Sequence, residues 1–332
     1  MSQIKIIDFS QHEIAEGIFY EGNAGSKEAV LQGQDVWMIK YPKTTRDMIN
    51  PQISYTTSPI SEYVGSKIYE SLGHPTHETL LGIRKGKIIV ACKDFLVRRN
   101  DPMAWGEIPL EFQYDRSKKL ISFHSLKNKF MATDIEEYSG TGAGTILSEV
   151  LDTIAKEPMF QNVNGVTERF WDMFVIDTFI GNNDRNNGNW GLILDYNKQT
   201  IELAPVYDNG NAFFNKRSIV QMEKRIGNEK EMLQDAMTNV SCIYKYSDMG
   251  GRSDHIKPFA FLEQTKIADC QQAVHRFLEK VDMVKIAEII ESIPQYEELL
   301  TVMPDSQKAF YLKLMELRLV KFQELAGGYV KN

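Results

Sequence analysis

The stretch of residues 181–210 constrains the fold of this 332-residue chain more than any other segment. It reads G-N-N-D-R-N-N-G-N-W-G, then a predicted hairpin, then A-P-V-Y-D-N-G. Residues 190–194 and 200–204 are apolar or β-prone, and the residues between them suit a turn. Paired strands lie about 4.8 Å apart, so a hairpin here would return the chain to its starting end. We therefore expect Asn189 and Asp208 to lie side by side.

The polar residues at the two ends of this stretch predict phosphoryl transfer. Asn189 and Asp208 both present side-chain oxygens, which are the ligands that magnesium prefers. Asp184 remains free to accept a hydrogen bond from a substrate hydroxyl. This spacing is typical of a kinase catalytic loop, in which one Asp orients the hydroxyl while an Asn and a second Asp hold magnesium on ATP. Asp184 is thus the candidate catalytic base, and Asn189 and Asp208 are the candidate metal ligands.

A plain turn and a calcium loop are the two alternatives for residues 181–189. Asn-Gly and Asp-Asn-Gly sequences form turns readily, so the segment could be only a polar turn. A calcium loop numbered from Asn182 would put Asn187 where an invariant Gly is needed and Ile193 where a bidentate Glu is needed, so the sequence does not fit one. The apolar helix predicted at residues 166–180, which leads directly into the loop, favours a built site over a simple turn.

Lys40 is the candidate phosphate-binding cation. It follows an apolar strand in which Val36, Met38 and Lys40 share one face. An ammonium in that position is costly unless it meets an anion, and ATP phosphates would serve. Glu62, on the helix that follows, is its expected partner, as in the kinase Lys–Glu pair. The alternative is an edge-strand lysine whose ammonium reaches water.

Two further segments are weaker candidates for contacts with the nucleotide. The G-N-A-G-S-K run at residues 22–27 joins two predicted strands, and its glycines would let backbone N–H groups approach phosphate oxygens. An ordinary hairpin turn accounts for it equally well. The end of the strand at residues 87–92 is a candidate hinge that offers backbone groups to adenine, or simply a strand end. The candidate residues in these segments are Gly25, Ser26, Lys27, Lys93, Asp94 and Phe95.

The hydrophobic patterns predict an α+β fold with two lobes. Residues 1–96 are expected to form a small antiparallel lobe with one helix, which starts at Ser58-Pro59 and stops at Gly73. Residues 97–332 are expected to form a larger, mainly helical lobe that ends near Gly327-Gly328. The predicted strands of the small lobe are 17–20, 28–31, 36–41, 79–83 and 87–92, and the predicted helices of the large lobe include 166–180, 267–293 and 306–325.

Composition excludes several classes of protein. The net charge of −7 argues against a nucleic-acid-binding face. Apolar runs are too short for a membrane span, and the N-terminus lacks the layout of a signal peptide. The three cysteines are far apart and odd in number, which indicates neither a disulfide framework nor a zinc site. We expect a cytoplasmic protein without a nucleic-acid or membrane partner.

Six sequence blocks, in this order, resemble the HipA-like serine/threonine protein kinases, and most closely the short, CtkA-type members. The resemblance implies a two-lobed protein-kinase-like fold, use of ATP and Mg²⁺, phosphorylation of a protein substrate, and autophosphorylation. It implies the same roles for Lys40, Asp184, Asn189 and Asp208, and it adds Tyr207 as a nucleotide contact. The blocks are W-M-I-K-Y-P (37–42), S-E-Y-V (61–64), E-T-L-L-G (78–82), K-I-I-V-A-C-K-D-F (87–95), W-D-M-F-V-I-D-T (171–178) and the G-N-N-D-R-N-N-G-N-W-G loop.

The chain departs from the family pattern in two ways. Asn186 stands where the family commonly has a His that contacts the nucleotide, although Asn can also form hydrogen bonds. The extra N-terminal subdomain of the toxin-type members is not recognisable, so an antitoxin-like partner is not indicated. Two other functions stay open at the level of sequence: a small-molecule phosphotransferase on the same fold, and a non-catalytic nucleotide-binding module.

Overall fold

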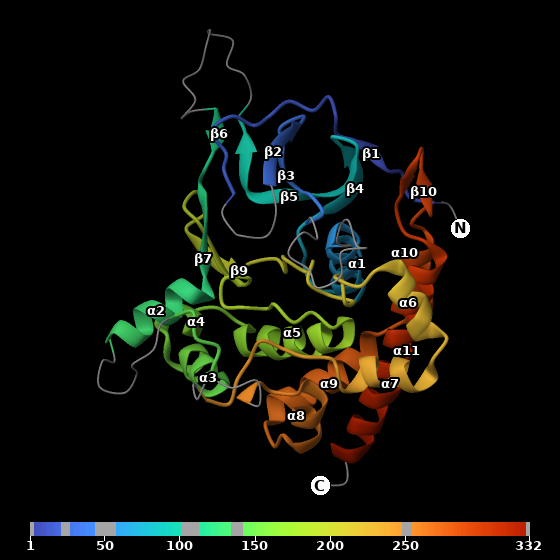
Figure 1. Cartoon of the computed structure of the whole chain (residues 1–332). Coiled ribbons are helices and arrows are strands. Elements are labelled where there is room, and N and C mark those ends of the chain that lie inside the picture. The colour runs from blue at the N-terminus through green and yellow to red at the C-terminus, as the bar shows by residue number, and fades with distance from the viewer. Residues whose placement is uncertain are drawn as a thin grey trace.

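The computed structural model describes residues 3–20, 27–43, 58–100, 113–133, 142–247 and 254–329. A curled sheet forms the upper part of the molecule and a group of helices forms the lower part (Figure 1). The two-lobed α+β fold predicted from the sequence is confirmed. The strands of the sheet are β1 (Ile7–Asp8), β2 (Lys27–Gln32), β3 (Asp35–Lys40), β4 (Thr79–Arg84) and β5 (Lys87–Arg99), in the order β1-β4-β5-β3-β2, with β6 (Tyr114–Asp115) paired to β5.

The sheet has two differently packed faces, because successive side chains in a strand point to opposite sides. Trp37, Ile39 and Ile89 belong to a small cluster on the outer face. Val90 and Cys92 belong to the main core, which includes the helices below the sheet. Lys40 therefore ends β3 close to the boundary between the sheet and the helical lobe.

Helix α1 (Ser58–Ser71) is the helix inserted between β3 and β4. It starts at the Ser-Pro pair, as predicted, and most of its side chains are buried. It packs against β4, β5 and α10 (Met283–Glu291). A Cβ atom added at Gly65 would lie 2.9 Å from the Cβ of Asn209. Glycine at this position thus allows α1 to approach the segment that contains Asp208.

Helix α5 (Val166–Ile180) is at the centre of the lower part of the molecule, as predicted. It is buried along nearly its whole length, and it ends at Gly181, whose φ is +73°. The chain then forms the Asp184 loop and the hairpin of β8 (Gly191–Asp195) and β9 (Thr200–Leu203), to which β7 (Lys118–Ser122) adds a third strand. The predicted hairpin is thus present, with its first strand displaced by one residue.

The remaining elements surround α5. Helix α9 packs along α5, and α11 packs against α5, α6, α7 and α9. Within the described ranges, we find no helix with the length and apolarity that a membrane crossing requires. The elements are α2 (Phe123–Thr133), α3 (Leu147–Lys156), α4 (Pro158–Gln161), α6 (Ile219–Ile226), α7 (Glu229–Met237), α8 (Pro258–Gln264), α9 (Ala268–Lys280), β10 (Tyr296–Glu297), β11 (Leu300–Thr301) and α11 (Asp305–Tyr329).

Three predicted elements differ from the structure. Residues 17–20 are not a strand, because Gly17 adopts a left-handed turn with φ of +77°. The predicted helix at 267–293 is two helices, α9 and α10, because the Asp282 side chain caps the start of the second. Helix α11 continues through Gly327 and Gly328, where the hydroxyl of Tyr329 donates to the backbone of Leu262.

Two further differences concern the sheet. Strand β5 is longer than predicted and runs to Arg99, so the expected lobe boundary at residues 96 and 97 falls inside a strand. The sheet is antiparallel except for β1, which pairs with β4 in parallel.

Candidate active site

Lys40, Glu62 and Asp208 come from distant parts of the chain and form one ion-paired cluster. The ammonium of Lys40 lies 2.8 Å from Oε2 of Glu62 and 2.9 Å from Oδ1 of Asp208. Burial opposes the charge on Lys40, but Asp208 and Glu62 outweigh it and raise the pKa of Lys40 well above its usual value. The end of β3, the start of α1 and the segment after β9 therefore meet at one cation.

Both carboxylate oxygens of Glu62 accept hydrogen bonds. Its side chain is only 1% exposed, and its Oε1 accepts hydrogen bonds from the backbone N–H of Asn209 at 2.9 Å and from Nε2 of His77 at 3.1 Å. Burial opposes ionisation of Glu62, but Lys40 and His77 together hold the pKa of this carboxyl below its usual value. Glu62 is therefore a buried carboxylate that fixes Lys40 and the residue after Asp208.

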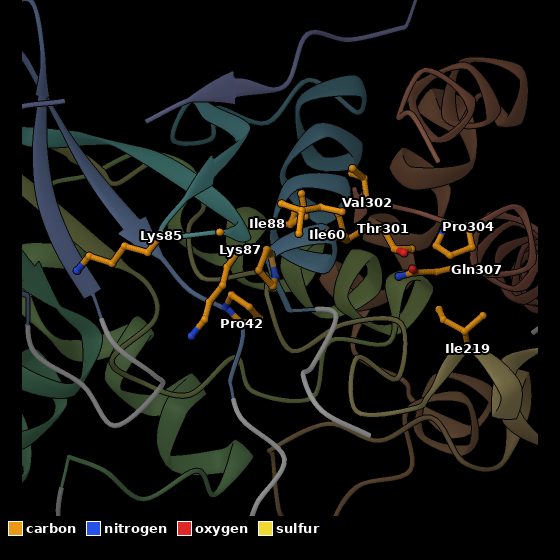
Figure 2. A pocket seen from close by; sticks show the side chains of 13 residues that line it. Pro42, Ile60, Lys85, Lys87, Ile88, Ile219, Thr301, Val302, Pro304 and Gln307 are labelled. Atoms are coloured by element: carbon orange, nitrogen blue, oxygen red, sulfur yellow. The ribbon is translucent and has the colours of Figure 1, made fainter. Parts of the chain in front are cut away.

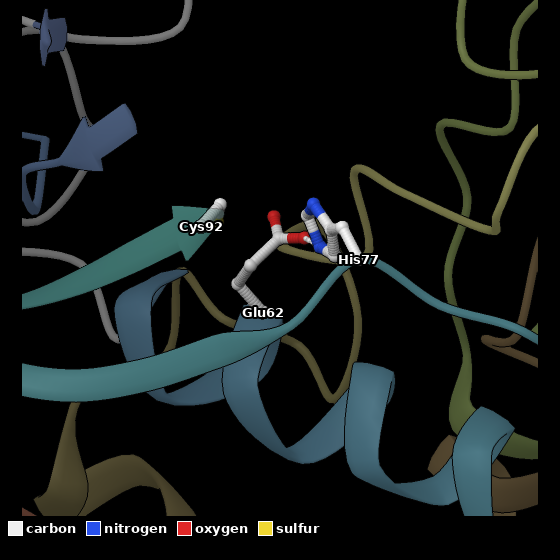
Figure 3. Close-up of side chains that lie close together, drawn as sticks. All are labelled: Glu62, His77 and Cys92. Carbon is white, nitrogen blue, oxygen red and sulfur yellow. Dashed lines mark hydrogen bonds and ion pairs between the residues drawn. The ribbon is translucent and has the colours of Figure 1, made fainter. Parts of the chain in front are cut away.

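Glu62, His77 and Cys92 lie close enough to suggest a metal centre. Their potential ligand atoms are within 4.8 Å of one another, and Figure 3 shows Glu62 and His77 in direct contact beside Cys92 of β5. However, both carboxylate oxygens already accept hydrogen bonds, one of them from the Lys40 ammonium. Burial also raises the pKa of the Cys92 thiol, which keeps it protonated. The cluster is better described as the buried support of the Lys40–Glu62 pair.

Lys27 lies beside Lys40, because the two residues are opposite each other in the β2–β3 ladder. Burial, followed by the charge of Lys40, lowers the pKa of Lys27. Two ammonium groups and the carboxylates of Glu62 and Asp208 therefore meet at one end of the sheet. Gly25 and Ser26, the other residues predicted for the phosphate turn, lie outside the described residues.

Asp184 lines the same cavity, of about 70 Å³, as Lys40, Glu62 and Asp208. One oxygen of its carboxylate accepts a hydrogen bond from the side-chain amide of Asn186 at 3.1 Å. Asn186 therefore contacts the candidate base directly.

The two candidate metal ligands differ in their surroundings. Asp208 has a left-handed backbone with φ of +59°, and its side chain is 40% exposed. Asn189 donates from its side-chain Nδ2 to the backbone oxygen of Asp184 at 2.7 Å, which leaves its Oδ1 as the atom available to a cation. Carboxylate and amide oxygens are ligands that magnesium accepts, so these residues fit the metal that the sequence implies.

Arg185 organises the site, and its role was not predicted from the sequence. Its guanidinium is buried and donates to Asp177 on α5, with Nε 2.8 Å from Oδ2. The same group donates to the backbone oxygens of Asn189 and Tyr207 and to the side-chain oxygen of Asn209. Burial opposes the charge, but Asp177 outweighs it and raises the pKa of Arg185 above its usual value. Arg185 thus joins the Asp184 loop to the Asp208 segment.

The predicted hinge is a bulge inside β5 rather than a strand end. The ladder with β3 skips from the Trp37–Lys93 pair to the Asp35–Arg98 pair. Oδ1 of Asp94 accepts hydrogen bonds from the backbone N–H groups of the bulge, including that of Leu96 at 2.8 Å. The side chain of Asp94 therefore holds the bulge in shape.

Of the residues predicted to contact the nucleotide base, Lys93 and Phe95 have side chains in different places. Lys93 pairs with Asp35 at 2.6 Å and lies over the ring of Trp37, which belongs to the outer cluster. Its side chain thus serves the outer face of the sheet, and only its backbone is available to the site. Phe95 lies with its ring centroid 5.8 Å from that of Tyr207, whose hydroxyl donates to the backbone of Gly188. The Phe95–Tyr207 pair thus brings the predicted hinge next to the segment that contains Asp208.

This fold and this arrangement of residues define a kinase-like phosphotransferase of the HipA class. Residues 24–281 match the HipA-like C-terminal domain, and the chain belongs to that family. It is 32% identical over 322 residues to the serine/threonine-protein kinase CtkA of Helicobacter pylori, covering 95% of this chain and 89% of that relative. The family predicted from the six sequence blocks is confirmed.

Solved structures agree with this assignment. The crystal structure of the Helicobacter pylori proinflammatory kinase CtkA matches with a TM-score of 0.79 and 29% identity, over 99% of each chain. A structure of the Shewanella oneidensis HipA–HipB toxin–antitoxin system with its operator DNA matches with a TM-score of 0.50 and 13% identity, over 97% of this chain and 74% of that one. The second similarity concerns the fold alone.

Proposed function

We propose that this chain is an ATP- and magnesium-dependent serine/threonine protein kinase that transfers the γ-phosphoryl group to a protein hydroxyl. The observation that carries the proposal is the bridging of Glu62 and Asp208 by Lys40 at 2.8 and 2.9 Å, with Asp184 on the wall of the same cavity. A charged lysine that is anchored by a buried glutamate is the arrangement by which kinases hold ATP phosphates.

Each residue has a defined task in this proposal. Lys40 and Lys27 bind phosphate oxygens, and Asn189 and Asp208 hold the metal. Magnesium bound there would offset the charge of the phosphate oxygens. Asp184 accepts the hydrogen bond of the acceptor hydroxyl and orients it for transfer.

Positioning residues complete the site. Asn186 orients the Asp184 carboxylate through its 3.1 Å hydrogen bond. Arg185 fixes the distance between the loop and the metal segment because it binds backbone atoms of both. Phe95 and Tyr207 provide an aromatic contact for the base, and the β5 bulge offers backbone groups to its edge.

The test compares the wild type with Asp184→Asn and Asp208→Asn on labelled ATP and cell lysate. Asp184→Asn should lose at least about 100-fold in phosphoryl transfer while it keeps its affinity for magnesium-ATP. Asp208→Asn should lose both, because its carboxylate acts on the metal and on Lys40. Asp269→Asn on α9 is the matched control and should behave like the wild type.

The same assay separates the other candidate functions. Labelled proteins identify a protein acceptor, and a mass increase of the chain itself identifies autophosphorylation. Nucleotide binding without any transfer, either to lysate components or to the chain itself, would contradict the proposal and indicate a non-catalytic nucleotide-binding module. Full transfer activity in Asp208→Asn would overturn the metal assignment.

A further inference from the structure

A second cavity, of about 530 Å³, adjoins the first turn of α1 (Figure 2). Pro59 lines both this cavity and the one at Asp184, so a single helical turn separates them. The cavity lies between the two lobes, since the turn between β4 and β5, the start of β5 and α1 line one side and β11, α6 and α11 line the other. Its lining residues are Pro42, Pro59, Ile60, Lys85, Gly86, Lys87, Ile88, Ile219, Leu300, Thr301, Val302, Pro304 and Gln307.

The cavity has the size and the walls of a small-molecule site. Ligand pockets usually measure roughly 300–1,000 Å³ and are mainly apolar, with a few polar groups that fix orientation. Here Ile60, Ile88, Ile219 and Val302 supply apolar walls. In Figure 2 the Lys85 side chain extends away from these residues, and its ammonium pairs with Glu28. The Lys87 side chain also runs away from Ile60 and Ile88, past Pro42, so both lysines lie at the rim and the interior favours an uncharged molecule.

Gln307 is the polar group aimed into this cavity. Its residue is only 1% exposed, and Figure 2 shows its amide directed toward the other lining side chains. Nε2 donates to the hydroxyl of Tyr311 at 3.0 Å. Oε1 has no hydrogen-bond partner within the part of the chain that the structure describes. Oε1 borders the cavity and is not sealed within the core, so a ligand that donates a hydrogen bond would take the place of water at this oxygen.

The partner of Gln307 connects the cavity to the candidate active site. The Tyr311 hydroxyl lies 3.1 Å from Oγ of Ser61, the residue before Glu62. The Tyr311 ring also stacks on Phe213, with centroids 4.3 Å apart and planes 13° apart. Phe213 belongs to the segment that follows Asp208, and it has a left-handed backbone with φ of +54°. One buried chain of contacts thus runs from the cavity to the residue before Glu62 and to the segment that follows Asp208.

We propose that this cavity binds a small, uncharged, mainly apolar molecule with one hydrogen-bond donor, and that its occupancy strengthens nucleotide binding. A donor on Oε1 fixes the Gln307 amide, and with it the Tyr311 hydroxyl and the first turn of α1. A ligand changes a distant site only if it binds one conformation better than another, and the two effects must be reciprocal. The coupling, though not the cavity, rests on the proposed function.

The probe for binding is 2-phenylindole, an apolar molecule with a single N–H donor. We expect it to bind the full chain with a Kd of roughly 1 mM or tighter, given its size. 1-Methyl-2-phenylindole lacks the donor and should bind about tenfold more weakly. In Gln307→Leu this difference should disappear, because the acceptor is gone while the volume is kept. No binding of 2-phenylindole to the wild type, or equal binding of both probes, would overturn the proposal.

Two variants of one helix locate the probe. Ile219→Trp at the start of α6 fills the cavity and should abolish binding. Ile226→Trp at the other end of α6, where the side chain is 38% exposed, should leave binding unchanged. Circular dichroism of both variants checks that they fold. Undiminished binding in folded Ile219→Trp would place the probe elsewhere and refute the site.

Coupling is measured by the affinity for magnesium-ATP with and without saturating 2-phenylindole. We expect at least about fivefold tighter nucleotide binding, and the same factor for the probe when nucleotide is saturating. Tyr311→Phe should keep the probe and lose the coupling. Unchanged nucleotide affinity in the wild type would overturn the coupling, whereas probe binding without any nucleotide binding would overturn the proposed function and leave the cavity standing.

Discussion

The Lys40–Glu62 pair holds two charges where water has little access. The side chains of Lys40 and Glu62 are only 14% and 1% exposed, respectively. Removal of one partner from such a pair leaves the other charge buried without compensation, which typically costs about 3–5 kcal/mol. The pair therefore stabilises the fold and also forms part of the candidate site.

Glu62→Gln tests the contribution of this ion pair to stability, because that contribution depends on pH. At pH 7 we expect the free energy of unfolding to fall by about 3 kcal/mol. The pKa of Glu62 in the folded protein lies below its ordinary value of 4.5, so its stabilising contribution is complete above that value and is lost as the pH falls through the folded pKa. The difference between wild type and variant should thus narrow below about pH 4.5.

Urea denaturation at pH 7 and pH 3.5 measures the difference. Glu70→Gln is the control on the same helix, because Glu70 pairs with Lys67 at 2.8 Å but is 59% exposed. Its effect should be below about 1 kcal/mol at either pH. A gap for Glu62→Gln that stays constant between the two pH values would show that its charge does not stabilise the fold.

The sequence alone reveals charged residues whose burial costs free energy unless a partner of opposite charge is present. Lys40 next to an apolar strand needed an anion, and Glu62 was the nearest helical carboxylate. His77, Arg185 and Asn209 were missed because their hydrogen bonds join segments that are distant in sequence and that only the folded chain brings together. One signal was available, since Asp177 within the apolar V-I-D-T-F-I run required a buried cation.

At the scale of elements, the two ends of α5 provide a comparison within one helix. Gly165 and Gly181 flank it with φ of +78° and +73°. A Cβ atom at Gly165 would meet nothing within 4 Å, whereas one at Gly181 would lie 2.9 Å from Nη1 of Arg318. Arg318 is buried and donates to the backbone oxygen of Phe179 at 2.9 Å. The second end is thus crowded by the group that caps the helix.

Substitution of each glycine by alanine should therefore have different effects. Gly165→Ala should cost about 1–2 kcal/mol, the strain of a left-handed alanine. Gly181→Ala should cost more, and it should also reduce phosphoryl transfer, because displacement of Arg318 shifts the start of the Asp184 loop. Urea denaturation and the labelled-ATP assay measure the two effects. Equal losses in both variants would contradict the role assigned to Arg318.

The elements that the sequence predicted well carry their own boundary signals. Helix α1 begins at Ser58-Pro59, and α5 ends at Gly181, where the left-handed backbone favours glycine over other residues. Strand β5 exceeded its predicted length because Arg98 and Arg99 pair with Asp115 and Tyr114, which are distant in sequence. Such pairing has no local signal, so its length could not be predicted.

At the scale of the whole molecule, His74 marks a junction between the lobes. It follows α1, and its ring lies among charged groups of α5 and α9. Burial, and then the charges of Arg169, Lys280 and Arg276, lower the pKa of His74 to about 4. Asp172 lies 3.8 Å away but is already paired with Arg276 at 2.6 Å. A protonated His74 would therefore add a cation to a cationic region.

This arrangement predicts a loss of stability in mild acid. Because the folded pKa lies below the unfolded value of 6.5, the unfolded chain binds the proton first, and stability falls as the pH drops from about 6.5 to about 4. We expect His74 to account for about 2 kcal/mol of the loss between pH 7.5 and pH 5. In urea denaturation, His74→Gln should lose about 2 kcal/mol less stability than the wild type between these two pH values. An identical loss in the variant would show that other groups cause it.

The largest core cluster contains side chains of α1, such as Val64 and Ile68, together with side chains of α5, such as Phe174 and Phe179. The two lobes therefore share one hydrophobic interior. For fragment design, this means that a piece ending near residue 96 would expose the apolar side of α1 to water and would tend to aggregate. Expression trials should consequently keep the chain whole and place tags or insertions at its surface loops.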